Sequence, residues 1–232
     1  MDVQNTTTMK HLPKQEMPYE KCWTSGAHCL TDAELLSVIL RTGSRGEPAL
    51  ELSRKILSQS GGAGLLGIYH LSVSELMKMK GIGRVKAIQL KCIAELSRRM
   101  AKEQAGKSLS FTDPESVAGY YMEDFRHEEQ EKLLLIMLNS KGKLLGEEVI
   151  SKGTVNATMI SPREIYLCAL RHLAVSIILL HNHPSGNPQP SDEDLILTQR
   201  VKQGGELLGI ELLDHIIIGD HQAVSFKRCE LL

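Results

Sequence analysis

The hydrophobic positions in the first hundred residues follow helical spacing. Thr31 and Glu34 form the pattern of a capping box, and Leu35, Leu36, Ile39 and Leu40 share one face of the helix that follows. Ser72 and Glu75 repeat the box. Glycine-rich turns separate the segments. The pattern predicts an all-α first half, with structure starting near Cys22 and helices over residues 32–40, 48–58, 72–79 and 84–102.

The hydrophobic period changes after residue 112. Asp113-Pro114 is typical of a helix start, and two short aliphatic runs flank a hairpin-type turn at residues 139–143. Helical and strand-like segments then alternate. The second half is therefore predicted to be mixed α/β, with strands over 133–138, 144–152, 174–180, 216–218 and 223–226 and helices over 162–172 and 192–204.

Composition divides the chain into the same two parts. Residues 103–112 are polar and small and predict a linker, and residues 1–20 predict a flexible lead-in. We expect one domain over 21–105 and another over 109–232. Residues 1–106 hold 15 basic and 10 acidic residues, whereas the rest hold 12 and 18. The basic first module permits a nucleic-acid partner without requiring one.

Several function classes do not fit this composition. Hydrophobic residues make up 42%, which is typical of packed cores. The longest apolar run, residues 173–180, is far shorter than the roughly 20 residues that span a bilayer. Residues 1–15 lack the apolar region of a signal peptide, so we expect a cytoplasmic protein without membrane contacts. Five cysteines without a CxxC pattern predict partly buried free thiols and no thiolate zinc site.

Two histidines follow the most apolar strand. Side chains at i and i+2 of a strand point the same way, so His181 and His183 would face one point. A proline-rich turn then leads to a helix whose first turn carries Asp194. Two imidazoles and one carboxylate with an open fourth position are the plan of a catalytic zinc site. Alternatively, Ser191 only caps the helix, Asp194 complements its dipole and the histidines are solvated.

The other histidines lack such spacing. His215 follows Asp214 and is interpreted as a structural hydrogen-bonding residue or as a contact behind the ligands. His221 falls in a turn. No partner at ligand spacing is evident for His28, His70, His127 and His172.

The segment from His181 to Asp194 resembles the JAMM (MPN+) metalloprotease motif, H-x-H followed by S-x-x-D. Its fuller form, H-N-H-P-S-G-x-x-x-P-S, resembles the RadC family. The resemblance implies a JAMM and cytidine-deaminase-like mixed sheet with flanking helices, preceded by a small helix-hairpin-helix domain. It extends over residues 30–36, 81–87, 153–154, 161–164 and 214–219.

The resemblance also implies roles for residues. His181, His183 and Asp194 would bind one Zn²⁺ per chain, with water in the fourth position. A glutamate before an aliphatic strand would act as general base. Ser191 would stabilise the oxyanion of a protein or peptide substrate. Glu131 matches the base best, Glu129 and Glu128 compete with it, and Glu147 and Glu148 lie on the next strand.

Residues 76–91 resemble a helix-hairpin-helix element. Gly81 and Gly83 would let backbone amides approach a DNA phosphate, and the flanking basic residues would add attraction without sequence preference. Alternatively, the glycines only make a tight turn. A second functional hypothesis is thus a DNA repair or recombination accessory protein with the zinc domain as scaffold, and a third is metal-assisted chemistry on a nucleic acid. The DNA-contacting candidates are Lys80, Gly81, Gly83, Arg84 and Lys86, with Lys78 nearby.

Overall fold

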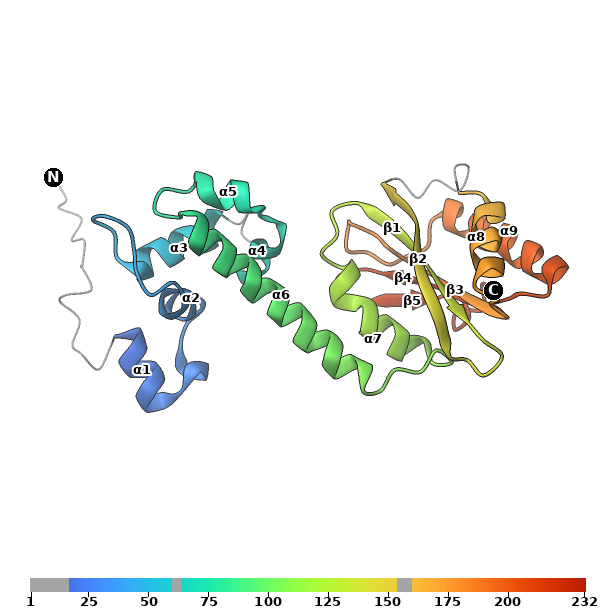
Figure 1. Cartoon of the computed structure of the whole chain (residues 1–232), viewed down its shortest axis with the longest axis horizontal. Helices are drawn as coiled ribbons and strands as arrows, with labels where there is room; N and C mark the ends of the chain where they lie inside the picture. The colour runs from blue at the N-terminus through green and yellow to red at the C-terminus, as the bar shows by residue number, and fades with distance from the viewer. Residues whose placement is uncertain (1–16, 60–63, 154–159) are drawn as a thin grey trace. The chain divides into compact units, whose positions relative to one another are not determined.

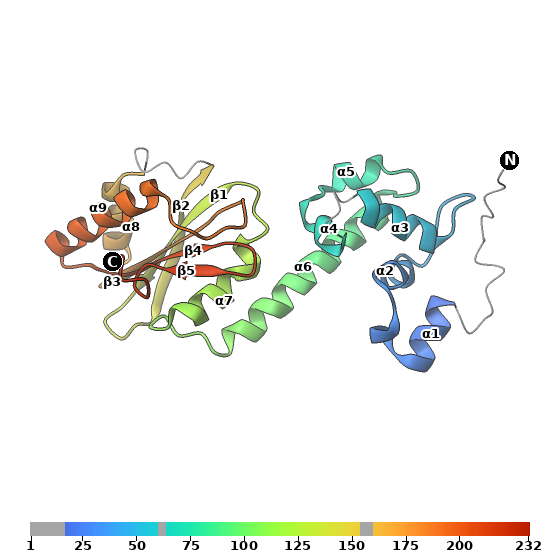
Figure 2. The ribbon, with the colours of Figure 1, turned by 180° about the vertical axis from the view of Figure 1, so that it is seen from behind.

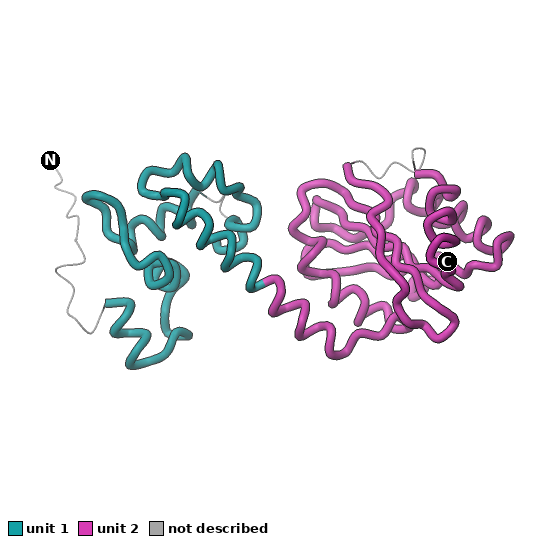
Figure 3. The backbone as a smooth tube through the Cα atoms, viewed as in Figure 1, with its two compact units in different colours: residues 1–97 teal, residues 98–232 magenta. Residues whose placement is uncertain are grey.

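The computed structural model describes residues 17–59, 64–153 and 160–232. The chain divides into two compact units, residues 1–97 and residues 98–232 (Figure 3). Three sequence predictions fall wholly or partly outside the described residues: most of the lead-in, the glycine turn at 61–64 and Thr154 of the family resemblance.

The first unit is built from helices, as predicted. Both expected capping boxes form, at Thr31 with Glu34 and at Ser72 with Glu75. The core buries Leu52, Ile56 and Leu76 completely. The helices are α1 (Pro18–Ser25), α2 (Asp32–Leu40), α3 (Ala49–Gln59), α4 (Gly67–His70), α5 (Val73–Lys78) and α6 (Arg84–Gly106), with 3₁₀ turns at Ala27–Cys29 and Gly64–Leu66.

Two predicted boundaries in this region are wrong. Helix α1 begins at Pro18, whose fixed φ favours the first helical turn, so the end of the expected lead-in is helical. Helix α6 continues to Gly106, through the first residues of the expected linker. The polar residues there favour helix as readily as coil, because Lys, Glu, Gln and Ala all have high helix propensity.

The second unit contains a five-stranded mixed sheet in the order β2-β1-β3-β4-β5. Strands β3 and β4 run parallel, and the other neighbouring pairs are antiparallel. The strands are β1 (Glu131–Leu138), β2 (Leu144–Gly153), β3 (Ser176–Asn182), β4 (Glu211–Ile218) and β5 (Ala223–Ser225).

Helices cover both faces of this sheet. Helix α7 (Pro114–Phe125) packs on one face, and α8 (Pro162–Arg171) and α9 (Asp192–Leu208) pack on the other (Figures 1 and 2). Alternate residues of β1 enter the two cores, with Leu133 on the α8–α9 side and Leu134 on the α7 side. A strand buried on both faces reads as a continuous aliphatic run, which is why the central strands stand out in the sequence.

Helix α9 and strand β4 extend beyond their predicted bounds. The sequence suggests that α9 ends at Gly204, but Gly204 and Gly205 are interior residues of the helix. A Cβ at Gly205 would lie 2.3 Å from the Ile210 carbonyl oxygen and 2.7 Å from the Tyr166 hydroxyl. Close packing requires glycine here, and the helix ends at the left-handed Gly209.

The architecture confirms the expected fold class, a helical region followed by a mixed sheet with flanking helices. Within the described residues, no helix is both long and apolar enough to cross a membrane.

Candidate metal centre

Three potential ligands meet where β3 ends and α9 begins. His181 continues the side of β3 that carries Ile177 and Leu179, and therefore points toward α9. His183 follows the strand, and its backbone amide donates to the Ile218 carbonyl. Asp194 lies in the first turn of α9 on the face that buries Leu197. The strand and helix thus bring together side chains that are separated by a proline-rich turn.

The ligand atoms are spaced as a tetrahedral metal site requires. His181 Nε2 lies 3.1 Å from His183 Nε2 and 3.2 Å from one Asp194 oxygen, and His183 Nε2 lies 3.3 Å from the other. Bonds of about 2.0–2.1 Å from Zn²⁺ at tetrahedral angles would separate such atoms by about 3.3 Å. His181 is fully buried, whereas the His183 side chain is 14% exposed. The donor set fits a zinc-type ion that is reached from the His183 side.

A chain of hydrogen bonds fixes the free lone pair of His181. The Thr198 hydroxyl donates its single proton to the backbone carbonyl of Asp194. Toward His215 Nδ1, 2.6 Å away, the hydroxyl can therefore only accept. The Nε2 of neutral His215 then accepts from His181 Nδ1 at 2.9 Å. This leaves the Nε2 of His181 unprotonated and aimed at the centre. Hydrogen bonds of this kind, made by the ring nitrogen that does not face the metal, are typical of metal-binding histidines.

His183 is oriented in a similar way. Its Nδ1 lies 2.9 Å from the Asn187 carbonyl, which can only accept a hydrogen bond. The Nδ1 therefore carries the proton, and neutral His183 presents the lone pair of Nε2. The Pro184–Pro190 turn supplies this carbonyl, so the turn orients a candidate ligand as well as connecting the strand to the helix.

The electrostatics of the cluster favour a charged carboxylate beside imidazoles. Burial alone would raise the pKa of Asp194, but His181 and His183, when they also carry a proton on Nε2 in the absence of an ion, donate to the carboxylate and hold that pKa far below its usual range. Hydrogen bonding to Asp194 raises the pKa of His183 against the opposing effect of burial. Complete burial lowers the pKa of His215, which keeps this ring neutral.

Glu131 begins the strand next to His183. Leu133 of β1 pairs with His181 of β3, so Glu131, two residues earlier, falls on the same face of the sheet. Its negative charge contributes to the raised pKa of His183. Asn182 fixes this strand start, because its side chain accepts from the Lys132 amide and donates to the Gln130 carbonyl.

The competing glutamates have other surroundings. Glu128 pairs with Lys132 and Lys152, and Glu129 is exposed. Glu147 accepts a hydrogen bond from the buried Tyr121, on the α7 side of the sheet. Glu148 contacts Cys168. Of the five glutamates, Glu131 is thus the one that the strand register directs toward the histidines.

Ser191 forms the capping box that the sequence also permits. Its hydroxyl donates to Asp194 Oδ2 at 2.7 Å and accepts from the Asp194 amide. Its own amide donates to the same carboxylate oxygen. A serine hydroxyl has a single proton, so in this arrangement Ser191 positions Asp194 and has no proton for a substrate oxyanion.

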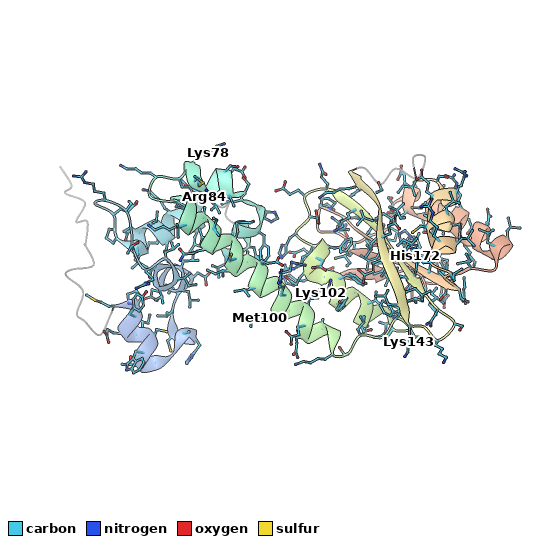
Figure 4. The ribbon with its side chains drawn as sticks, viewed as in Figure 1. Lys78, Arg84, Met100, Lys102, Lys143 and His172 are labelled. Atoms are coloured by element: carbon cyan, nitrogen blue, oxygen red, sulfur yellow. The ribbon has the colours of Figure 1, made fainter. Side chains whose placement is uncertain are left out.

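The glycine turn of the first unit divides its basic residues into two kinds. Lys86 donates to the carbonyls of Gly43 and Gly81, at 2.6 and 3.1 Å, and so holds the turn together. Lys80 and Arg84 are exposed, as are Lys78 and Gly83. Figure 4 labels Lys78 and Arg84. Gly81 has φ of +97° and no room for a Cβ beside Ser44, whereas nothing crowds Gly83.

Sequence reasoning missed two features of the second unit. Thr198 has no motif of its own, although it lies one helical turn after Asp194 and could have been sought there. His172, for which the sequence shows no partner at ligand spacing, lies with Glu148 and Cys168 in a second group of potential metal ligands. The cysteines also differ from expectation: Cys168 is buried and Cys22 partly so, but Cys29, Cys92 and Cys229 are exposed.

Comparisons with known proteins agree with the resemblance in the motif. A family model described as RadC-like JAB domain matches residues 111–231, and one described as UPF0758 N-terminal matches residues 9–88. A UPF0758 protein of Caldanaerobacter subterraneus subsp. tengcongensis is 42% identical over 95% of this chain and 94% of its own. UPF0758 proteins of Desulforamulus reducens and Clostridium acetobutylicum are also 42% identical, over 97% and 99% of this chain and 98% and 100% of theirs. The chain therefore belongs to the family of proteins with a RadC-like JAB domain.

Proposed function

We propose that the second unit is a metal-dependent peptidase or isopeptidase of the JAMM type, with one Zn²⁺ held by His181, His183 and Asp194. The observation that carries the proposal is the spacing of the candidate ligand atoms: the two Nε2 atoms lie 3.1 Å apart, and each lies 3.2–3.3 Å from an oxygen of the Asp194 carboxylate. The hydrogen bonds that direct both imidazole lone pairs to one point between these atoms support it further. Three protein donors leave a position for substrate or water, as in catalytic zinc sites.

The protein groups around this point have separate tasks. A bound Zn²⁺ would supply Lewis acidity, polarising a carbonyl and making water acidic near neutral pH. Glu131 takes the proton of the attacking water on its carboxylate and passes it to the leaving amine. The buried His181 side excludes solvent, so the substrate carbonyl approaches beside His183. Ser191 keeps the Asp194 carboxylate in place.

The substrate class is a peptide or isopeptide bond in a protein. Only ten residues separate His183 from Asp194, so this segment contains no insertion that could grip a folded ubiquitin-like protein. An accessible peptide or a flexible terminus suits such a centre better than a folded domain does.

Metal content tests this proposal first. Elemental analysis of purified protein should find zinc that is lost from the centre in a His181→Ala/His183→Ala variant, so that the variant holds one ion per chain fewer than wild type. Circular dichroism would check that the variant is folded. Equal metal content in the two folded proteins, after reconstitution with zinc, would overturn the assignment of the centre.

A second candidate function is DNA binding by residues 76–91. The observation that favours it is the N-terminus of α6, where the exposed Gly83 leaves backbone amides open beside Lys80 and Arg84. Helix N-termini attract phosphate through unpaired amides and the helix dipole. The proposed contacts read no bases, so affinity would be independent of sequence and would fall steeply with salt. A peptidase centre and a DNA-binding turn can function in the same chain.

Fluorescence anisotropy with labelled single-stranded and duplex DNA tests this second function. Binding in low salt that weakens log-linearly with salt concentration is expected. No anisotropy change with either DNA in low salt would remove the DNA-binding turn and leave the metal centre as the functional site. The converse result, DNA binding with no metal at the centre, would support an accessory protein with the sheet domain as scaffold.

A further inference from the structure

A second group of metal-ligating side chains lies in the same unit, away from the centre just described. Cys168 and His172 stand one helical turn apart at the end of α8, and Glu148 reaches them from β2. Figure 4 labels His172. The Cys168 sulfur lies 2.7 Å from Glu148 Oε2 and 3.9 Å from His172 Nδ1. None of these residues takes part in the proposed peptidase.

All three side chains are of types that bind metal ions. Thiolate, imidazole and carboxylate are the three kinds of side chain that bind Zn²⁺ in proteins. The Met137 thioether adds a neutral, soft sulfur 3.6 Å from the Cys168 sulfur. An exposed carboxylate hydrogen-bonded to a surface group is common. Here a carboxylate and an imidazole both lie against the thiol of the buried Cys168, beside a thioether.

The distances between these donor atoms must change slightly before the three side chains can bind an ion. Bonds of about 2.3 Å to sulfur and about 2.0 Å to nitrogen or oxygen would place the sulfur about 3.5 Å from each of the other donors in a tetrahedral site. The Glu148 oxygen must therefore move outward, and His172 Nδ1 must approach and release the Cys168 carbonyl, 3.0 Å away. Glu148 and His172 are both exposed and can make these adjustments.

The Cys168 thiol keeps its proton unless a cation replaces it. Burial and the neighbouring Glu148 carboxylate raise the pKa of Cys168 to about 12. Loss of the proton alone would leave two negative groups in contact, which is why the free thiol stays protonated near neutral pH. A divalent ion would neutralise both groups as the proton leaves to solvent.

We propose that Glu148, Cys168 and His172 form a second site for a divalent zinc-type ion, with one thiolate ligand, which joins the edge strand β2 to helix α8. Among the described strands, β2 pairs with β1 alone. The ion would therefore connect β2 to the end of α8 as well. The site has the three protein ligands that leave a fourth position open to solvent or to an exogenous ligand. It is independent of whether the His181 centre catalyses any reaction.

Cobalt substitution of the full-length protein separates this site from the first. Co²⁺ with a thiolate ligand gives an intense ultraviolet sulfur-to-metal charge-transfer absorption, and the His181 centre contains no sulfur. With thiols kept reduced, wild type should bind two Co²⁺ and show this absorption. The His181→Ala/His183→Ala variant should bind one Co²⁺ and keep the charge-transfer absorption. The Cys168→Ser variant should also bind one Co²⁺, at the His181 centre, but should lack the charge-transfer absorption.

Matched variants control for misfolding and for other thiols. Cys92→Ser removes an exposed cysteine and should leave the absorption unchanged. Glu148→Gln and His172→Gln alter exposed residues, and each should weaken the absorbing Co²⁺ at least tenfold while circular dichroism stays the same. The proposal is overturned if wild type shows no charge-transfer absorption, or if the absorption survives in Cys168→Ser. Failure of the His181 centre would appear differently, as one Co²⁺ in wild type with the absorption intact.

Discussion

The His181 centre and the Gly81–Gly83 turn differ in how far their surroundings determine what they do. At the centre, burial and hydrogen bonds assign each ligand atom its protonation and direction. At the turn, one lysine is tied to carbonyls while its basic neighbours extend into solvent. A buried polar cluster must satisfy every group and so has few alternative arrangements. Exposed charges have many alternative arrangements. The geometry of the Gly81–Gly83 turn is therefore compatible both with a DNA-binding turn and with a simple connection between helices.

The largest expected effect is on catalysis at the centre. Glu131→Gln should reduce kcat about 10²- to 10⁴-fold, because the amide cannot accept a proton from water. Metal content should remain that of wild type, since Glu131 is not among the proposed ligands. Turnover of a peptide substrate and elemental analysis on the same preparation measure both. Glu129→Gln is the matched control and should keep full activity. Wild-type turnover by Glu131→Gln would reassign the base.

The next effect tests the hydrogen-bond chain behind His181. Thr198→Val keeps the shape of the side chain but removes the group that accepts from His215. The chain no longer fixes the lone pair of His181, so metal affinity should fall about 10- to 100-fold. Competition with a chelator measures this change. Thr198→Ser restores the hydroxyl and should recover wild-type affinity. Equal affinity in Thr198→Val would show that the chain does not orient the ligand.

The sequence predicts the two regions unequally well, for physical reasons. Local chemistry shows in local patterns, so the capping boxes at Thr31 and Ser72 and the buried strand that carries His181 could be predicted. The contact of His181 with His215 depends on the parallel register that sets Leu179 beside His215, and no motif encodes this. The grouping of Glu148 with Cys168 depends in addition on the register shift between β1 and β2 at Met137 and Leu138, which sets Glu148 beside Leu135. Contacts made through sheet register require the fold itself.

In the first unit, Lys86 should matter more for stability than for DNA. Lys86→Met keeps the aliphatic stem but leaves the Gly43 and Gly81 carbonyls without their charged donor, which should cost about 2 kcal/mol. Hydrogen exchange of the amides of α3 and of residues 84–97 of α6 would measure this loss in the first unit alone. A variant with unchanged exchange but weaker DNA binding would instead place Lys86 among the phosphate contacts.

A smaller effect distinguishes the two roles of Ser191. Ser191→Ala removes the cap of α9 and should lower the free energy of unfolding by about 1 kcal/mol. Turnover of metal-loaded enzyme should change little, because the hydroxyl proton is used by Asp194. Substrate kinetics on fully metallated protein test this. A loss of kcat of about 10²-fold or more would show that Ser191 stabilises the oxyanion after all.

The smallest expected effect is on the salt dependence of DNA binding. Arg84→Ala removes an exposed cation next to the open amides of α6, and one lost phosphate contact should reduce the slope of log K against log salt by about 0.9. The protein should remain as stable as wild type, because Arg84 is exposed. Anisotropy titrations at several salt concentrations give the slope, with Arg54→Ala on α3 as an exposed control. If both variants reduce the slope equally, the attraction comes from general charge. If Arg84→Ala alone does so, the turn holds the phosphate.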